Sequence, residues 1–278
     1  METLNYFNQI AAVFLNPEVK AWKEKNNLVI GVQCSGIPEE IIHAAGIMPM
    51  RVRAPGLTDT NKADAHLHRI NCSYTRSVLE YLLSGKLDFL DGFVATNTCD
   101  HHLRLVSEIK DKSNFNFFHY FQMFHSLAHG SKEWLIKEMQ ELIKNIEGTL
   151  GIRITEDNLR NTISVYNKTR SLMAKVNELR KNDPPPISGT EYLNIVLAGI
   201  SIQKEIFNEH LEAALPEFEK RSIYNKKLPR LLVVGGSCDL PGFIDFIESK
   251  GAYVVADGMC FGLRHYIGII DDNISDPI

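Results

Sequence analysis

Short apolar segments alternate with helical patterns over the first half of the chain. The apolar segments are rich in β-branched or aromatic residues and predict strands, and the helical spacing of apolar positions elsewhere predicts helices. The predicted strands are 28–32, 89–95 and 114–121, and the predicted helices are 38–45, 74–83 and 100–110. Strands that alternate with helices form parallel sheets with crossover helices. We therefore expect a flavodoxin- or Rossmann-like α/β lobe.

The middle of the chain has helical spacing throughout. An amphipathic pattern begins at Ser131, and Thr155, followed directly by two acidic residues, forms a good helix N-cap. Consecutive prolines at 184–186 interrupt the pattern, and a further helix is predicted over 188–211.

After Pro229 the strand–helix pattern returns. Strands are predicted at 230–234 and 252–256, with a helix at 241–250 between them. Two strands are fewer than an α/β lobe of usual size contains, so we expect a lobe with a partly exposed core and a chain truncated at its C-terminus. The expected domains are an N-terminal helix at 1–27, a first α/β lobe at 28–125, a helical region at 126–228 and an incomplete second α/β lobe at 229–278.

Composition and charge narrow the class of protein. The chain has 278 residues, of which 44% are hydrophobic and 23% charged, which is typical of a globular protein. Its net charge of -4 gives no overall attraction to nucleic acid or to an anionic membrane, and no apolar run is long enough to span a bilayer. The N-terminus lacks the segments of a secretory signal. We therefore expect a cytoplasmic protein with no nucleic-acid or membrane partner, whose cysteines serve metal binding or chemistry rather than disulfides.

Four of the five cysteines follow predicted strands: Cys34, Cys99, Cys238 and Cys260. Because ligands bind at the carboxyl ends of the strands in open α/β sheets, these positions point to a site. Cys72 and Cys99 also open predicted helices, where the helix dipole favours the thiolate. A cysteine can equally be a small buried hydrophobic residue. No CxxC spacing supports a structural zinc site, and ligation by cysteine alone favours an iron–sulfur cluster.

Other candidate residues carry weaker signals. His101 and His102, next to Cys99, could be ligands or proton donors, although adjacent histidines at a helix start are more often one exposed and one packed. The pair His66 and His68 stands similarly close to Cys72. The glycines after strand 230–234 lack the GxGxxG spacing of a dinucleotide turn.

Several segments resemble the 2-hydroxyacyl-CoA dehydratase and benzoyl-CoA reductase family, to which the D-component of 2-hydroxyglutaryl-CoA dehydratase belongs. The longest resemblance is SGKLDFLDGFVATNTCD at 84–100, which is similar to a specific signature of that family. The other matching segments are IPEEIIHAAGIMPMR at 37–51, NCSYTRS at 71–77, GGSCDLP at 235–241 and ADGMCFGLRHY at 256–266. The resemblance runs from about residue 17 to the end of the chain.

This resemblance implies an oxygen-sensitive [4Fe–4S] subunit that acts on an acyl-CoA or aryl-CoA substrate. Such subunits pair with a homologous partner subunit and receive an electron from a separate ATP-hydrolysing iron–sulfur activator. Cys72 and Cys99 match two cluster ligands, and Cys260 is the best substitute for a third, because the C-D-P segment that carries it in the family is absent from this sequence. That ligand could also lie beyond residue 278. Ser35 matches a region that faces substrate, so we take it as a catalytic candidate.

Three functions remain open from the sequence. The first is a radical-type enzyme subunit that dehydrates 2-hydroxyacyl-CoA or reduces an aryl-CoA ring. The second is an ATP-dependent reductase with a double-cubane cluster, which Cys34 and Cys260 suggest as additional ligands. The third is a non-redox assembly or binding subunit, which the missing third ligand suggests.

Overall fold

The computed structural model describes residues 2–124, 126, 130–224, 227–271 and 274–278. By its internal contacts the chain divides into two compact units. Unit 1 comprises Met1–Lys20 and Ser164–Asp271, and unit 2 comprises Ala21–Ile163 and Asp272–Ile278. The boundaries of these two units differ from the four domain ranges expected from the sequence. Whether those four ranges fold as separate domains stays a prediction.

Unit 2 is built on a parallel sheet. Its four strands are β1 (Val29–Val32), β2 (Met48–Arg51), β3 (Gly92–Thr96) and β4 (Phe117–Phe121), in the order β2-β1-β3-β4. This confirms the expected α/β class with a parallel sheet, and the order is that of flavodoxin-like sheets. The sequence did not predict β2, because Pro49 interrupts it. Proline is tolerated there because β2 is an edge strand, where a missing N–H costs no pairing on the outer side.

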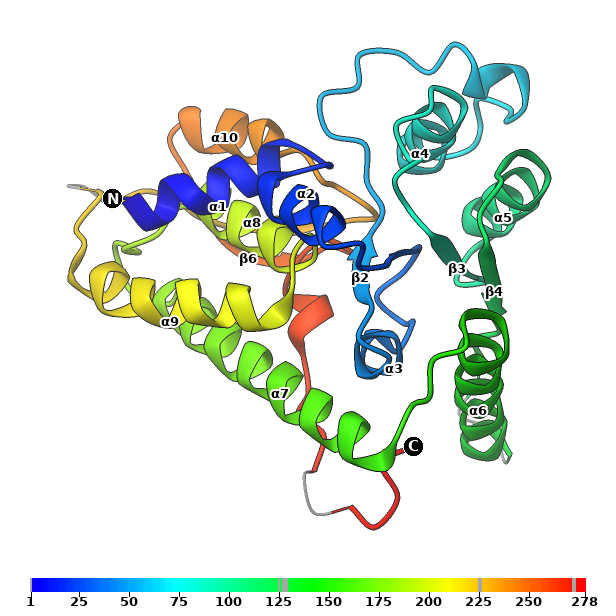
Figure 1. Cartoon of the computed structure of the whole chain (residues 1–278). Helices are drawn as coiled ribbons and strands as arrows, with labels where there is room; N and C mark the ends of the chain where they lie inside the picture. The colour runs from blue at the N-terminus through cyan, green and yellow to red at the C-terminus, as the bar shows by residue number, and fades with distance from the viewer. Residues whose placement is uncertain (1, 125, 127–129, 225–226, 272–273) are drawn as a thin grey trace. The chain divides into compact units, whose positions relative to one another are not determined.

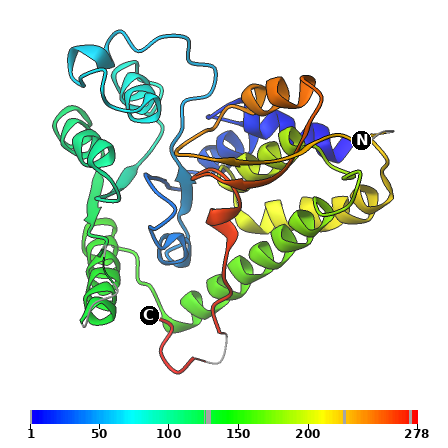
Figure 2. The same ribbon diagram turned by 180° about the vertical axis from the view of Figure 1, so that it is seen from behind.

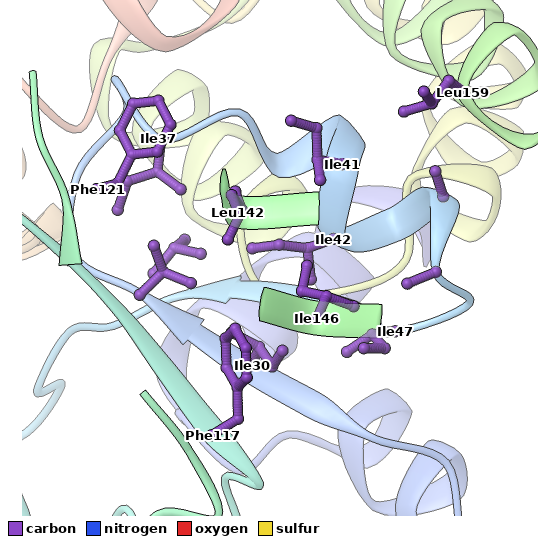
Figure 3. Packing of buried hydrophobic residues seen from close by; sticks show 14 residues of the cluster. Ile30, Ile37, Ile41, Ile42, Ile47, Phe117, Phe121, Leu142, Ile146 and Leu159 are labelled. Atoms are coloured by element: carbon purple, nitrogen blue, oxygen red, sulfur yellow. The ribbon is translucent and has the colours of Figure 1, made fainter. Parts of the chain in front are cut away.

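One face of this sheet forms the core of unit 2 (Figure 3). It is covered by α3 (Glu39–Ala44) and α6 (Ser131–Leu150). Ile42 of α3, Leu142 of α6 and Val94 of β3 are fully buried there. The labelled side chains of Figure 3 are Ile30, Ile37, Ile41, Ile42, Ile47, Phe117, Phe121, Leu142, Ile146 and Leu159.

The other face carries α4 (Ser73–Leu83) and α5 (Asp100–Lys112), which pack on each other (Figure 1). Because side chains alternate along a strand, Phe93 faces these helices when its neighbour Val94 faces the core. Both residues are fully buried, so the apolar run of β3 is explained by burial on both faces. The short helix η1 (Ala63–Ala65) contacts α4.

Unit 1 packs helices around a smaller sheet. The strands β5 (Arg230–Val234) and β6 (Tyr253–Gly258) pair in parallel, with α10 (Pro241–Ser249) between them in the chain and next to β6 in space (Figure 2). The remaining elements of unit 1 are α1 (Glu2–Ala12), α8 (Gly189–Gly199), α9 (Lys204–Lys220) and η2 (Leu263–Tyr266). The helices α2 (Pro17–Glu24) and α7 (Glu156–Leu179) contribute residues to both units.

The single helix expected over 188–211 is wrong, since α8 ends at Gly199 and α9 begins at Lys204. The break has a local cause. The Lys204 ammonium donates a hydrogen bond to the Gly199 carbonyl (2.8 Å), and the Ser201 hydroxyl donates to the Leu197 carbonyl (2.7 Å). These side chains satisfy the carbonyls at the end of α8 and let the chain turn.

The sheet of unit 1 is much less covered than that of unit 2. The side chains of Leu232 and Val234 on β5 are 62% and 70% exposed, and Phe246 on α10 is 58% exposed. The expected partial exposure of the core after residue 229 is therefore present. Within the described residues, no helix is both long and apolar enough to cross a membrane.

Candidate thiol and metal site

Three cysteines gather at the carboxyl-terminal edge of the sheet of unit 2. Cys34 follows β1 after one intervening residue, Gln33, and Cys99 follows β3. The hydroxyl of Tyr74, in the first turn of α4, donates to the carbonyl oxygens of Gln33 and Val52, at 3.2 and 2.8 Å. Because those carbonyls stand at the ends of β1 and β2, the start of α4, and with it Cys72, lies at the same edge.

Cys72 and Cys99 each occupy the N-cap position of a helix, α4 and α5 respectively. The two helix starts are joined, since the backbone N–H of Cys72 donates a hydrogen bond to Nδ1 of His101 at 3.2 Å. Neither cysteine side chain caps its own helix, so both sulfurs stay available. The sulfur of Cys72 lies 3.6 Å from the hydroxyl of Thr75, and Cys99 is exposed. Both cysteines therefore lie at the positive end of a helix dipole.

The Cys34 side chain is partly buried and surrounded by groups that favour its charged form. Burial acts to raise the pKa of its thiol. Hydrogen bonds from the His102 and Thr98 side chains and from the Gly36 backbone, together with the charge of Arg51, outweigh burial and lower that pKa to about 6. These groups therefore favour the thiolate form of Cys34.

His102 is held in place on several sides. Its Nδ1 lies 2.9 Å from the hydroxyl of Thr98, and its backbone carbonyl accepts a hydrogen bond from the Gln33 amide at 3.1 Å. The Gln33 side chain also accepts the N–H of Thr96 at 2.9 Å. The His102 side chain is almost fully buried, so one of the two adjacent histidines is packed, as the sequence suggested.

A hollow of about 680 Å³ opens beside the starts of α4 and α5. Asn71 and Asp100, the neighbours of Cys72 and Cys99 in the chain, line it. The other lining residues are His66, Leu67, His68, Ile70, His101, Arg104, Ser107 and Glu108. Both histidines that the sequence places before Cys72 thus border this hollow, and Nδ1 of His66 lies 3.7 Å from a carboxylate oxygen of Glu108.

The remaining cysteines belong to unit 1. The backbone N–H of Cys260 donates to the Gly236 carbonyl at 3.2 Å, which ties the turn after β6 to the turn after β5 that leads to Cys238. Burial raises the pKa of the Cys238 thiol. The assignment of Cys72, Cys99 and Cys260 to one cluster stays a prediction, as does the role of Ser35, which is exposed next to Cys34. Among the residues described, no group of three His, Cys, Asp or Glu side chains is arranged to hold a metal ion.

The pairing of Cys34 with His102 was not predicted from the sequence. The two residues are far apart in the chain, and they meet because β1 and β3 are neighbours in the sheet. The sequence does show a cysteine after one predicted strand and a histidine in the first turn of the helix that follows another strand. To pair them, one must also know that the two strands are neighbours, and the sequence does not give the strand order.

A sequence model of the family described as 2-hydroxyglutaryl-CoA dehydratase, D-component, matches residues 34–278. The chain belongs to this family. The match begins at Cys34 and includes every cysteine, so the resemblance noted from the sequence motifs is confirmed.

Relatives with known names support the same family. A benzoyl-CoA reductase subunit of Thauera aromatica is 30% identical over 246 residues, which cover 86% of this chain and 63% of that protein. The (R)-2-hydroxyglutaryl-CoA dehydratase subunit beta of Acidaminococcus fermentans is 25% identical, over 88% of this chain and 65% of its own length. The (R)-phenyllactyl-CoA dehydratase beta subunit of Clostridium sporogenes is 23% identical, over 94% and 71%. The chain thus spans less than two thirds of the first and second of these relatives.

Proposed function

We propose that this chain is the iron–sulfur subunit of an ATP-activated, radical-type enzyme that acts on CoA thioesters. The reaction is dehydration of a 2-hydroxyacyl-CoA or reduction of an aryl-CoA ring. The observation that carries this proposal is the position of Cys72 and Cys99 on two joined helix starts, within a family whose named relatives are CoA-thioester dehydratase and reductase subunits.

The donor set suits two of the ligands of a [4Fe–4S] cluster. Cys72 and Cys99 offer soft sulfur donors, the ligand type that iron–sulfur clusters take, and neither sulfur is used to cap its helix. A bound cluster supplies one-electron transfer at low potential. Ligation needs the deprotonated sulfur.

Other residues of this edge have roles in binding and orientation. His101 accepts the N–H of Cys72 and so holds the start of α4 against the first turn of α5. Asn97 exchanges two hydrogen bonds with the backbone of Met123, at 2.7 and 3.1 Å, which fixes the turn between β3 and Cys99. Ser35 is exposed next to Cys34, and we propose that its hydroxyl donates a hydrogen bond to a substrate oxygen.

We include in the proposal a homologous partner subunit and a separate ATP-hydrolysing activator. The relatives are named as subunits, which supports an assembly of more than one chain. The test is to produce the chain anaerobically together with a homologous subunit and an ATP-hydrolysing activator of this family. We expect ATP-dependent turnover of a 2-hydroxyacyl-CoA or an aryl-CoA. A complex that carries its clusters and is reduced by the activator, yet converts neither class, would contradict the proposed reaction.

A double-cubane cluster is the second candidate. It is favoured by the hydrogen bond from the Cys260 N–H to the Gly236 carbonyl. This bond joins the turn after β6, which carries Cys260, to the turn after β5, which leads to Cys238, at one strand edge of unit 1. Iron analysis of the reconstituted full-length protein separates the candidates. About four irons per chain supports a single cubane, and about eight supports the double cubane.

A further inference from the structure

The hollow beside the starts of α4 and α5 has two walls of different origin. One wall is a face of α5, because Asp100, Arg104 and Ser107 follow one another at helical spacing and all line the hollow. The other wall is the segment 66–71, which leads to Cys72. A volume of about 680 Å³ is that of a site for a small organic ligand. The hollow is therefore large enough to bind a ligand, and its polar groups decide which kind.

The segment 66–71 is anchored to α4 just before it begins. The guanidinium of Arg76 on α4 donates hydrogen bonds to both carboxylate oxygens of Asp64, at 2.7 and 2.9 Å. Glu80, also on α4, accepts the backbone N–H of Ala63 at 2.9 Å. A bidentate arginine–carboxylate pair fixes the relative orientation of its two partners. The second wall is thus held before a ligand arrives, which lowers the entropy cost of binding.

Two histidines of this hollow have one ring nitrogen fixed by a backbone N–H. Nδ1 of His68 accepts the N–H of Ile70 at 3.1 Å, and Nδ1 of His101 accepts the N–H of Cys72 at 3.2 Å. A ring nitrogen that accepts a hydrogen bond carries no proton, so the proton of the neutral imidazole is on Nε2. Each of these two imidazoles therefore offers an Nε2–H donor to the hollow without a change in its charge.

Arg104 adds a permanent positive charge to the same lining. The residue is exposed, and its guanidinium makes no hydrogen bond or ion pair within the described part of the chain. Arg104 follows His101 by three residues on α5, so the two side chains are neighbours on one helix face. A guanidinium can donate two parallel hydrogen bonds to a phosphate group. The hollow therefore combines two imidazole donors with an unengaged guanidinium.

Two carboxylates also line the hollow and limit its attraction for anions. The carboxylate of Glu108 is compensated, since it lies 3.6 Å from Nζ of Lys112 and 3.7 Å from Nδ1 of His66. Asp100 is exposed and has no ion-pair partner among the described residues, so its charge opposes that of an anion bound at Arg104. The positive and negative charges around the hollow therefore balance. Selection of a ligand depends on the hydrogen-bond donors rather than on net charge.

We propose that this hollow is a phosphate-binding subsite, in which His68, His101 and Arg104 donate hydrogen bonds to phosphate oxygens. The oxygens of an ionised phosphate accept hydrogen bonds, and the groups that these three side chains have available only donate them. The side chain of Ile70, which is 77% exposed in the same lining, offers an apolar contact to a ligand that also carries an organic part. The source of the phosphate is the CoA portion of the thioester, which is the one step that rests on the proposed function.

The test is isothermal titration calorimetry of the full chain with CoA, inorganic pyrophosphate and pantetheine, the thiol-bearing part of CoA without its phosphates. We expect CoA to bind, pyrophosphate to compete with it, and pantetheine to bind at least about tenfold more weakly than CoA. Ile70→Ala should weaken the binding of CoA and leave that of pyrophosphate unchanged. Pyrophosphate binding that depends on Arg104 but is not displaced by CoA would support the phosphate subsite and overturn CoA as its source.

Two substitutions remove single donors. Arg104→Gln should weaken the binding of CoA and of pyrophosphate by about tenfold or more, because a hydrogen bond between two charged groups is lost. His68→Asn should weaken both by about three- to tenfold, since the amide oxygen can still accept the N–H of Ile70 while the Nε2–H donor is gone.

Two further substitutions are matched to Arg104→Gln. Arg69→Gln removes an arginine of the segment 66–71 that does not line the hollow and whose side chain is 84% exposed, so it should change the affinity by less than about twofold. Asp100→Asn removes the opposing charge and should strengthen the binding of pyrophosphate by about two- to threefold. Circular dichroism checks the fold of every variant.

The proposal is overturned if wild type binds neither CoA nor pyrophosphate at millimolar concentration. It is also overturned if folded Arg104→Gln binds both as tightly as wild type, or if pantetheine binds as tightly as CoA. Calorimetry measures binding without turnover. A failure here therefore leaves the proposed reaction standing, and a complex without turnover leaves the phosphate subsite standing.

Discussion

The sheets of the two units contain similar strands with very different surroundings. β3 and β5 are both short apolar strands that are each followed by a turn, a cysteine and a helix. Every residue of β3 is buried, whereas only Val233 of β5 is not classed as exposed. β3 pairs on both sides and has helices on both faces, while β5 pairs with β6 and with no other strand in the described part of the chain. Whether an apolar strand is buried therefore depends on the strands and helices around it. Its own sequence shows only that it can be buried.

The units also differ in how they use polar groups. Unit 2 has buried polar groups at its strand ends, where Gln33, Thr96 and His102 are joined by hydrogen bonds. Unit 1 instead contains a buried ion pair, with Nη1 of Arg180 2.7 Å from a carboxylate oxygen of Asp257 and both side chains almost fully buried. We therefore expect the stability of unit 1 to depend on this ion pair and the stability of unit 2 to depend on its apolar core.

The largest effect is expected from breaking the pair in unit 1. Asp257→Asn leaves the Arg180 charge buried without a counter-charge, which should destabilise unit 1 by about 3–5 kcal/mol. Asp257 also accepts the backbone N–H of Leu263 at 2.8 Å, so the turn that contains Cys260 should loosen. Urea unfolding followed by circular dichroism measures the loss.

The matched control for that substitution is an exposed ion pair of the same unit. The side chains of Lys181 and Glu178 are 68% and 61% exposed, so Glu178→Gln should change the unfolding free energy by at most about 0.5 kcal/mol. Equal effects of the two substitutions would mean that the buried pair does not support unit 1.

A single substitution made in both sheets tests the comparison of the strands directly. Val94 on β3 is fully buried, and Val234 on β5 is 70% exposed. Val94→Ala removes buried methyl groups and leaves a cavity, which should cost about 2–3 kcal/mol. Val234→Ala should change stability by at most about 0.5 kcal/mol. Thermal and urea unfolding of both variants measure the two losses of stability. Similar losses would contradict this account.

The smallest effect is a pH dependence in unit 2. The pKa of Cys34 in the folded chain, about 6, lies below that of an unfolded thiol, about 8.5. The stabilisation from its thiolate is complete above the unfolded pKa and is lost as the pH falls toward 6. The advantage of wild type over Cys34→Ser should thus grow from pH 6 to pH 8 by about 1 kcal/mol per pH unit.

Urea unfolding of these two proteins under reducing conditions measures that difference. Cys238→Ser serves as the control in unit 1, because burial raises the pKa of that thiol and its thiolate adds nothing near neutral pH. An advantage over Cys34→Ser that stayed constant with pH would show that the Cys34 thiolate is not stabilised by folding.

Much of the fold could be predicted from the pattern of apolar residues. The strands around Ile30, Val94 and Phe117 and the helix that begins after Cys72 were expected close to their observed positions. β2 was missed because the presence of a proline in an edge strand depends on the strand order. The break after Gly199 was missed because a lysine side chain, rather than a proline, accompanies it.

The candidate site was predictable only in part. A cysteine after a strand can be placed at the carboxyl-terminal edge from the sequence alone, and Cys34 and Cys99 are found there. The contact of Cys34 with His102 depends on which strands are neighbours, and the joining of Cys72 to His101 depends on how α4 meets α5. Such contacts between distant segments arise from packing, which a local pattern does not describe.

The central claim is that Cys72 and Cys99 are ligands of an iron–sulfur cluster. The most direct measurement is the iron and sulfide content, with the visible absorbance, of the full-length protein after anaerobic reconstitution, for wild type, Cys99→Ala and Cys238→Ala. Cys99 is exposed and does not cap its helix, so Cys99→Ala should leave the circular dichroism unchanged. We predict that this variant loses nearly all its cluster iron while wild type and Cys238→Ala keep theirs. Full iron content and absorbance in Cys99→Ala would contradict the claim.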